Sequence, residues 1–291
     1  MIKILKNSNL TVKIATHGAE LSSALASDGF EFIRQKDDRW ANSSPILFPV
    51  CGRLKNNEYR LGGKRYDLTP HGFILHSDFE VLSEASDSVT LVFHSNEQSR
   101  RVYPFDLTVT VEYTLVGKTL KSSYTVKNNS SAPMPFMIGL HPAFKLPLGE
   151  GIKTNEHKID FGRKRLTYHP LCNGCFVSKK SEEWDIPDGV YTINEEAIYE
   201  NDTLVFANAP SKVRLYADGT TREVKMEYSP EFSYFCIWKR ADKDDKYLCL
   251  EPWTSVPTEG LLDECFDGRE DMFSLSPNSE MSFFCNITFE F

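Results

Sequence analysis

Residues 105–126, which read FDLTVTVEYTLVGKTLKSSYTV, decide the fold. The first half alternates apolar and polar side chains, and one face of the long strand that it predicts carries Phe105, Leu107, Val109, Val111 and Tyr113. A tight turn is predicted at residues 116–119, where Gly117 can adopt the positive φ that such turns need. A second alternating run, residues 120–126, follows the turn. The stretch therefore predicts an antiparallel hairpin with one buried face.

The same period of two recurs along the chain. It is found at residues 10–14, 89–93 and 281–291, and glycine-containing turns at residues 61–64 and 216–219 predict further hairpins. Only residues 181–184 and 195–201 invite a short helix, and both are acidic enough to be solvated loops instead. No repeat, low-complexity tract or linker divides the chain. We therefore expect an all-β protein, a single domain over residues 1–291 built as one large antiparallel β-sandwich.

Charge and composition exclude several classes of partner. The formal net charge is -8, and no concentrated basic face is visible, which argues against nucleic-acid binding. No run approaches the roughly 18 apolar residues of a membrane span, and the N-terminus lacks the apolar segment of a secretory signal. We expect a cytoplasmic protein with no membrane partner, whose N-terminus forms a strand.

The cysteines do not form a recognisable framework. The chain has 7, an odd number scattered along its length, as expected of reduced thiols in a cytosolic protein. Cys172 and Cys175 make one C-x-x-C, but no second pair follows at zinc-ribbon spacing. We expect ordinary buried or loop thiols.

Polar residues interrupt the apolar pattern in four islands. Arg53 lies in residues 43–59 (SSPILFPVCGRLKNNEY), His71 in 68–81 (LTPHGFILHSDFEV), His141 in 134–144 (MPFMIGLHPAF) and Glu251 in 247–257 (YLCLEPWTSVP). A carboxylate among apolar residues is costly to bury unless it is paired, so Glu251 is a strong site candidate. Each of the others also has a structural interpretation: His141 as a core imidazole, Arg53 as a surface cation, and His71 as a cap of its turn.

The islands can be compared with two known kinds of site. A metal site of the cupin type would use His71, His76, His141 and Glu251. The spacing disfavours it, because residues five apart lie on opposite faces of a strand, whereas strand chelation favours H-x-H. Glycoside hydrolysis needs two carboxylates across a sugar, and only Glu251 has such a setting.

Taken in order, the islands resemble a known family. PILFP with the following GR, then PHGF, GLHPAF and LEPWT, are similar to the motifs of the aldose 1-epimerase, or galactose mutarotase, family, in particular its LacX-like branch. The resemblance spans most of the chain. It implies a single-domain antiparallel β-supersandwich, a sugar-binding cleft on one face, and no metal or organic cofactor.

The resemblance also assigns roles to residues. Glu251 corresponds to the general base that takes the proton of the C1 hydroxyl, and His141 to the general acid that protonates the ring oxygen. We expected the imidazole to be protonated near neutrality without extreme tuning. Arg53 and His71 correspond to residues that bind sugar hydroxyls and the ring-opened oxygen. Asp202 is the candidate acidic partner of vicinal hydroxyls, and either Trp253 or Phe73 could stack on the sugar or pack in the core.

One departure from the family bears on the substrate. Many relatives read HGFAR where this chain reads HGFIL, so Leu75 occupies the arginine position. Near the islands the sequence offers four cations, namely Arg53, Lys55, Arg60 and Arg65. We therefore expect a neutral free aldohexose as substrate. We also expect the protein to be a monomer or a weak homodimer. The alternatives are a hexose-6-phosphate mutarotase and a non-catalytic sugar-binding or sensing protein on the same fold.

Overall fold

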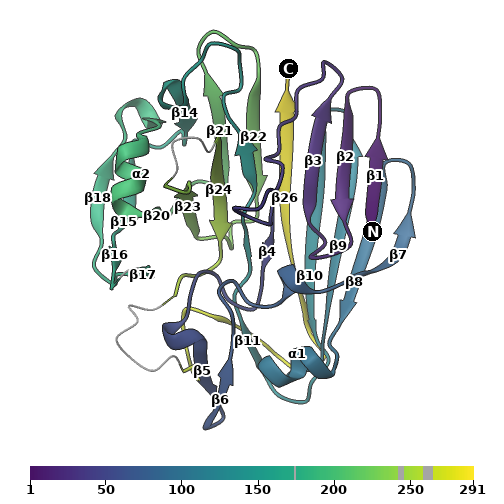
Figure 1. The fold of residues 1–291 in the computed structure, drawn as a ribbon. Coiled ribbons are helices and arrows are strands. Elements are labelled where there is room, and N and C mark those ends of the chain that lie inside the picture. Colours follow the sequence, from purple (N-terminus) through teal and green to yellow (C-terminus); the bar gives the residue numbers. More distant parts are fainter. Residues whose placement is uncertain (174, 242–245, 258–264) are drawn as a thin grey trace.

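The computed structural model describes residues 1–173, 175–241, 246–257 and 265–291. Within them strands predominate, they pair antiparallel, and two large sheets account for most of them (Figure 1). The prediction of an all-β, antiparallel fold is confirmed. Its basis is the alternation of apolar and polar side chains, which gives each strand one face for the core.

The larger sheet contains the hairpin with which the sequence analysis began. Its nine described strands lie in the order β19-β14-β21-β22-β26-β10-β9-β8-β7. Their bounds are β7 Glu80–Glu84, β8 Ser88–His94, β9 Leu107–Val116, β10 Thr119–Asn128, β14 His157–Asp160, β19 Val190–Thr192, β21 Lys212–Ala217, β22 Glu223–Tyr228 and β26 Glu280–Glu290. The strand β26, at residues 280–290, lies between β22 and β10, so residues far apart in the sequence meet at the centre of the sheet.

The second sheet carries the functional site. Its described strands follow the order β18-β15-β20-β23-β24-β12-β4, and β13 also pairs with β24. Their bounds are β4 Ile46–Leu47, β12 Gly139–Leu140, β13 Ala143–Lys145, β15 Arg165–His169, β18 Glu182–Asp185, β20 Thr203–Ala207, β23 Tyr234–Trp238 and β24 Tyr247–Trp253. All seven residues of β24 are buried, as expected of a strand covered on both faces.

Smaller elements cover the edges and ends of these sheets. The described strands are β1 Ile2–Lys6, β2 Leu10–Ala15 and β3 Leu21–Ala26 in one sheet, and the pairs β5 Glu58–Leu61 with β6 Lys64–Asp67, β11 Met134–Phe136 with β25 Phe273–Leu275, and β16 Leu171–Cys172 with β17 Phe176–Val177. The described helices are α1 Glu97–Val102, α2 Glu195–Asn201 and four 3-10 turns at Lys55–Asn57, Ile74–His76, Thr154–Glu156 and Pro187–Gly189.

The hydrophobic core follows the predicted faces. All five apolar residues of the first alternating run are buried, from Phe105 at 5% exposure to Val111 at 0%. The hairpins predicted at residues 61–64, 116–119 and 216–219 are present, and the N-terminal and C-terminal segments both form strands. Period-two alternation and glycine turns therefore placed the long strands around β9, β10 and β26, whereas many of the short strands were not predicted.

The predicted helices had mixed outcomes. Residues 195–201 form α2, as expected. For residues 181–184 both the short helix and the solvated loop are wrong, because these residues enter β18, which pairs with β15 through contacts such as Leu166 opposite Trp184. The helix α1 was missed, although Asn96 and Ser99 form a capping box at its start, a recognisable local signal.

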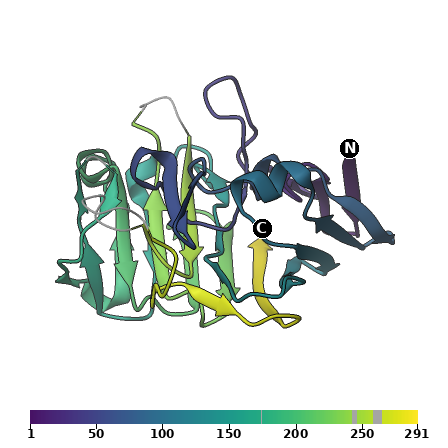
Figure 2. The ribbon, with the colours of Figure 1, turned by 90° about the horizontal axis from the view of Figure 1, so that it is seen from below.

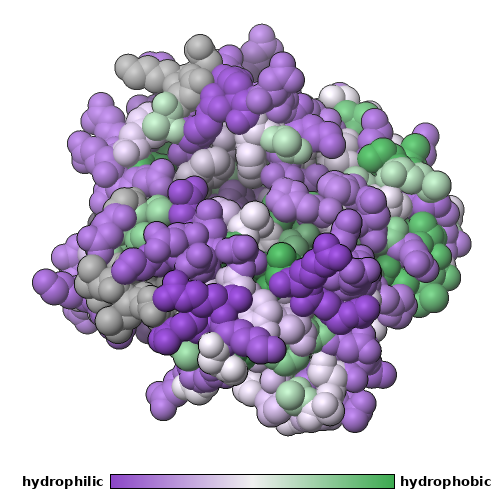
Figure 3. Space-filling view, turned by 60° about the horizontal axis from the view of Figure 1, so that its bottom comes forward, coloured by the Kyte–Doolittle hydropathy of each residue, from purple (hydrophilic) through white to green (hydrophobic). Residues whose placement is uncertain are grey.

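The exterior is mostly polar. Figure 3 shows hydrophobic side chains gathered on the side where β1 and β7 lie, and the exposed members there include Met1, Ile2, Ile4 and Leu82. None of the helices in the described residues is long and apolar enough to cross a membrane. All seven cysteines are free thiols, as the sequence analysis predicted.

Candidate active site

A cleft of about 460 Å³ opens beside β24 and brings the sequence-predicted site residues together. All six candidates from the sequence analysis lie on its wall, together with residues that it did not single out. The described lining consists of Arg39, Trp40, Asn42, Pro45, Gly52, Arg53, Pro70, His71, Leu75, His141, Cys175, Asp202, Thr203, Trp238, Arg240, Glu251 and Trp253.

Glu251 is held within the sheet. It lies on β24, opposite Cys236 of β23, and only 1% of its surface is exposed. Neither of its carboxylate oxygens makes a hydrogen bond to a described residue. A buried carboxylate without hydrogen bonds is costly, so this position is a place where a polar ligand would be stabilised.

His141 faces Glu251 from the neighbouring segment of chain. It follows β12, and its backbone N–H donates to the Pro45 carbonyl (3.1 Å), which fixes the start of the side chain. Its Nε2 atom lies 3.2 Å from Glu251 Oε2, and its exposure is 7%. A nitrogen and a carboxylate oxygen of two titratable groups thus meet at the bottom of the cleft.

Burial changes the proton affinity of both groups in opposite directions. It raises the pKa of Glu251 well above its usual range, against the opposing effect of the Trp253 side chain, and the negative charge of Asp202 adds to the rise. It lowers the pKa of His141 well below its usual range, and His71 contributes in the same direction. The expectation of an imidazole protonated near neutrality without tuning is therefore wrong for the free cleft. There, the neutral imidazole and the protonated carboxyl are favoured.

The islands around Arg53 and His71 fit into each other. The Gly52 backbone N–H donates to His71 Nδ1 (3.1 Å), and the His71 backbone N–H donates to the Gly52 carbonyl (2.7 Å). Since Nδ1 accepts a hydrogen bond, the His71 ring is neutral, and burial, together with the charge of Arg53, lowers its pKa to about 4. These two bonds place Arg53 and His71 on the same wall.

The glycine after His71 permits this fit. His71 and Gly72 both have positive φ, at 64° and 80°. A Cβ on Gly72 would lie 2.0 Å from the Phe48 carbonyl oxygen, so no other residue can occupy this position without moving the backbone. The PHG motif is therefore a requirement of backbone packing as well as of chemistry.

Trp40 reaches the cleft from a long loop. The loop projects from the sheets beside the end of β23 (Figure 2), and Arg240 donates to the Arg39 carbonyl across this contact (3.2 Å). The buried Arg34 holds the loop through bonds to the Trp40 and Asn42 carbonyls, both 2.9 Å. The Trp40 ring then lies 5.3 Å from the His141 ring, centroid to centroid.

The remaining predicted residues are distributed around the opening. Asp202 ends α2 and lines the cleft with Thr203. Trp253 lies at the end of β24, with its ring centroid 5.9 Å from that of His71. Phe73 is different: it packs against Phe48 and Tyr103 in the core and is not part of the described lining, so it is not a stacking surface for a sugar.

Of the four cations noted near the islands, only Arg53 lines the described cleft. Lys55, Arg60 and Arg65 do not line the described cleft, whereas Arg39 and Arg240 do. Both missed arginines adjoin a tryptophan in the sequence, Arg39 before Trp40 and Arg240 two residues after Trp238. That proximity is a weak signal, because it does not show that the two segments meet.

The residues of the cleft fall into two groups, a floor and a rim. The floor consists of His71, His141, Glu251 and Trp253, which come from the sheet and from the turn packed on it. The rim consists of Arg39, Trp40, Arg53, Asp202 and Arg240, which are exposed or half-buried. The floor offers proton transfer, and the rim offers charge, hydrogen bonds and an aromatic face.

Comparison with known proteins identifies the family of the chain. The family model described as aldose 1-epimerase matches residues 1–288. The chain belongs to the aldose 1-epimerase family. The chromosomal LacX protein of Lactococcus lactis subsp. lactis, a relative in this family, is 28% identical over 272 residues, which cover 87% of this chain and 88% of LacX.

Solved structures extend the aldose 1-epimerase comparison to the fold. A galactose mutarotase related enzyme from Lactobacillus acidophilus is 29% identical with a TM-score of 0.91, over 99% of this chain and 97% of that one. A galactose mutarotase-like protein from Lactobacillus casei ATCC 334 is 25% identical, also with a TM-score of 0.91, over 99% and 100% of the two chains. The galactose mutarotase-like fold and a sugar epimerase of the mutarotase type are thereby supported.

Proposed function

We propose that this protein is an aldose 1-epimerase that interconverts the α and β anomers of a free aldohexose such as galactose or glucose. The observation that carries the proposal is the contact between His141 Nε2 and Glu251 Oε2, 3.2 Å apart on the floor of a cleft with aromatic and charged walls. Anomer exchange needs one proton acceptor and one proton donor on the same sugar, and this contact provides two such groups side by side.

The chemistry proceeds by ring opening and closure. The C1 hydroxyl gives its proton to Glu251 while the C1–O5 bond breaks and O5 takes a proton from His141. The resulting aldehyde turns about the C1–C2 bond, and O5 attacks its other face as the two protons return. Atoms and charges balance without a cofactor. Each group typically contributes about 10²- to 10⁴-fold to the rate.

The protonation states that the reaction needs, a charged His141 and a charged Glu251, depend on bound sugar. In the free cleft, burial favours a neutral His141 and a protonated Glu251. The carboxylate oxygens have no hydrogen bond to a described residue, so sugar hydroxyls that donate to them would stabilise the charged carboxylate. We infer that sugar binding moves the carboxyl proton of Glu251 to His141 and so prepares the acid and the base together.

Three rim residues and two floor residues have binding roles in this proposal. Arg53 and His71 bind hydroxyls and the ring-opened oxygen, Asp202 accepts from vicinal hydroxyls, and a tryptophan covers the apolar face of the sugar. Trp40 joins Trp253 as a candidate for this cover, because its ring is half-buried and adjoins His141.

Polarimetry tests the function directly. The optical rotation of freshly dissolved α-glucose and α-galactose is followed with and without protein, and acceleration is expected for at least one of them. No acceleration for any aldose tested, with binding still seen by calorimetry, would instead identify a non-catalytic sugar-binding protein on the same fold.

A hexose 6-phosphate is a second candidate substrate. Arg39 and Arg240 line the cleft together with Arg53, and guanidinium groups are the usual partners of a phosphate. Against this, Arg39 already pairs with Asp37 (3.2 Å) and the chain as a whole is acidic.

Comparison of kcat/KM for glucose, galactose and their 6-phosphates at two ionic strengths separates the candidates. A free-sugar enzyme prefers the neutral sugars at both ionic strengths. A preference for the phosphorylated sugar that weakens as salt rises, and that Arg240→Gln abolishes, would establish the second candidate.

A further inference from the structure

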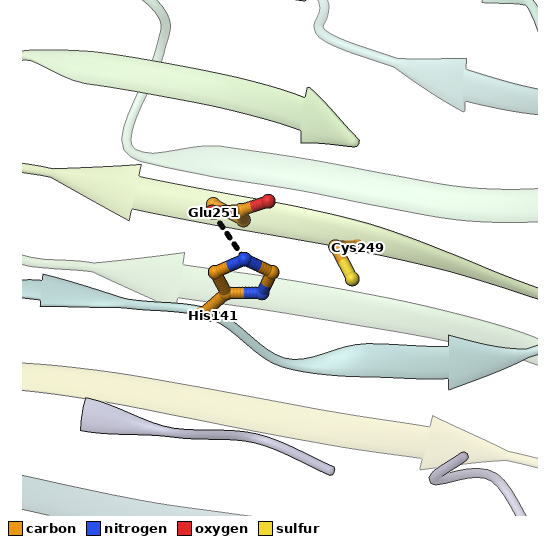
Figure 4. A group of neighbouring side chains, drawn as sticks. All are labelled: His141, Cys249 and Glu251. Carbon is orange, nitrogen blue, oxygen red and sulfur yellow. Dashed lines mark ion pairs between the residues drawn. The ribbon is translucent and has the colours of Figure 1, made fainter. Parts of the chain in front are cut away.

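Cys249 places a third ligand-bearing side chain next to His141 and Glu251, although it does not itself line the described cleft. It precedes Glu251 by two residues on β24, so both side chains point to the same side of the strand (Figure 4). His141 faces them from the neighbouring segment. One nitrogen, one sulfur and one carboxylate oxygen of these three residues all lie within 4.8 Å of one another.

These atoms form a donor set typical of zinc. Imidazole nitrogen, thiolate sulfur and carboxylate oxygen are the three common zinc ligands, and a site with three protein ligands leaves a fourth position open. Ideal tetrahedral ligand atoms lie roughly 3.3–3.8 Å apart, given bond lengths of about 2.0–2.3 Å. Because the three donor atoms lie within 4.8 Å of one another, the more distant pairs must draw closer for all three to bind one ion.

Charge balance strengthens the case. A divalent cation bound by one thiolate, one carboxylate and one neutral imidazole gives a complex with no net charge, which suits a buried position. The three residues are 0%, 1% and 7% exposed for Cys249, Glu251 and His141. His141 and Glu251 line the cleft, which gives an ion access from solvent. The rim arginines oppose a cation, and the two bound anionic ligands offset them.

We propose that His141, Cys249 and Glu251 form a binding site for Zn²⁺ and similar transition-metal ions that inhibits the enzyme. The ion takes the two groups assigned to proton transfer, so a sugar cannot use them while it is bound. Binding displaces the proton of the Cys249 thiol and the carboxyl proton of Glu251, and both are released to solvent. Mg²⁺, which prefers oxygen ligands, does not bind there.

Cobalt absorption tests the site without reference to activity. Co²⁺ is added to the wild-type protein, and a thiolate-to-cobalt charge-transfer band with intense visible bands of a tetrahedral ion is expected at one equivalent per chain. Cys249→Ala should remove the charge-transfer band. It should also weaken the affinity for Zn²⁺, measured by competition with a chromophoric chelator, by at least about 100-fold. Cys249→Ser provides a second variant if the alanine variant does not fold.

Variants of other cysteines test whether the cobalt band comes from the sulfur of Cys249. Cys236→Ala removes a buried thiol on the adjacent strand, opposite Glu251 and outside the three-residue group, and keeps the band. The double variant Cys172→Ser and Cys175→Ser also keeps it. Absence of a charge-transfer band in the wild type, its survival in Cys249→Ala, or its loss in either control would overturn the proposal.

Inhibition is measured separately. Zn²⁺ is expected to stop mutarotation by the wild-type protein and a chelator to restore it, and this arm rests on the proposed function. If the protein catalyses no mutarotation, the cobalt spectra still decide whether the metal site exists. If zinc binds to Cys249 and mutarotation continues unchanged, the inhibitory role is wrong.

Discussion

The floor and the rim of the cleft are built in different ways. The floor residues lie on strands or on a turn bonded to them, and Glu251 is on a strand whose seven residues are all buried. The rim residues come from loops and element ends, and Trp40 depends on the hydrogen bonds of Arg34 to keep its place. Chemistry that needs fixed distances is thus assigned to the rigid part. Much of the recognition, by Arg53, Asp202 and Trp40, is assigned to loops, where substitutions need not disturb the sheet.

Glu251→Gln should cause the largest loss of activity among the floor residues. The amide is nearly the same shape but cannot accept the C1 hydroxyl proton, so mutarotation should fall by at least about 100-fold. Polarimetry measures the rate, and circular dichroism with thermal unfolding checks that the fold is intact. Retention of more than about a tenth of the activity would contradict the role of a base.

His141→Asn tests the other half of the floor. The loss should be of similar size, about 100-fold or more, because O5 would have no proton donor. The melting temperature should change little, since neither Nδ1 nor Nε2 of His141 makes a hydrogen bond that holds the described fold together. A variant that unfolds and shows no specific loss of turnover would instead indicate a structural core histidine.

Trp40→Ala sharpens the comparison from the side of the rim. If Trp40 covers the sugar, KM should rise by about 3- to 10-fold with little change in kcat, as expected when binding is lost equally in the ground and transition states. Trp40→Phe should recover most of the loss. Trp184, which packs against Tyr168 away from the cleft, provides the control as Trp184→Phe. A fall in kcat alone would place Trp40 with the floor.

His157 belongs to neither region and should affect folding only. It is fully buried, Nε2 accepts from the Leu148 N–H (3.0 Å), and Nδ1 lies 2.9 Å from the Lys153 carbonyl oxygen, an arrangement that requires a neutral ring. Burial lowers its pKa, so the unfolded chain takes up a proton at higher pH than the folded protein. Its contribution to stability is complete above pH about 6.5 and is lost as the pH falls toward the folded pKa.

Urea unfolding at pH 7.5 and pH 5 measures this effect. The wild type should lose up to about 2 kcal/mol from this group on acidification. His157→Gln should show a smaller loss, and the exposed control His94→Gln should behave like the wild type. An equal loss in His157→Gln would show that other groups account for the acid sensitivity.

The same contrast explains what could be predicted from sequence. A polar residue inside an apolar strand is energetically unusual, so Glu251 and His141 were visible, and the glycine and prolines of the neighbouring islands drew attention to Arg53 and His71. Arg39 and Trp40 lie among polar loop residues, where arginine and tryptophan are unremarkable. Their place in the cleft depends on the buried Arg34 and on the meeting of two distant loops.

Other errors have similar causes. Residues 181–184 were expected to form a short helix or a solvated loop because they are acidic, but pairing with β15 decided the conformation of the strand they enter. Cys249 was overlooked because a cysteine in an apolar strand resembles any other core residue. The spacing of two residues from Glu251 was its only signal. Local patterns predict strands and their faces, whereas contacts between distant segments depend on the completed fold.

The position of β26 also limits the order in which the protein can be completed during synthesis. This strand, Glu280–Glu290, lies between β22 and β10, so until it leaves the ribosome the two halves of the larger sheet cannot join. The nascent chain meanwhile presents two unpaired strand edges, which are sites for pairing with other chains. Ribosome-bound chains that stop before residue 280 should therefore depend on chaperones far more than chains that extend past residue 290.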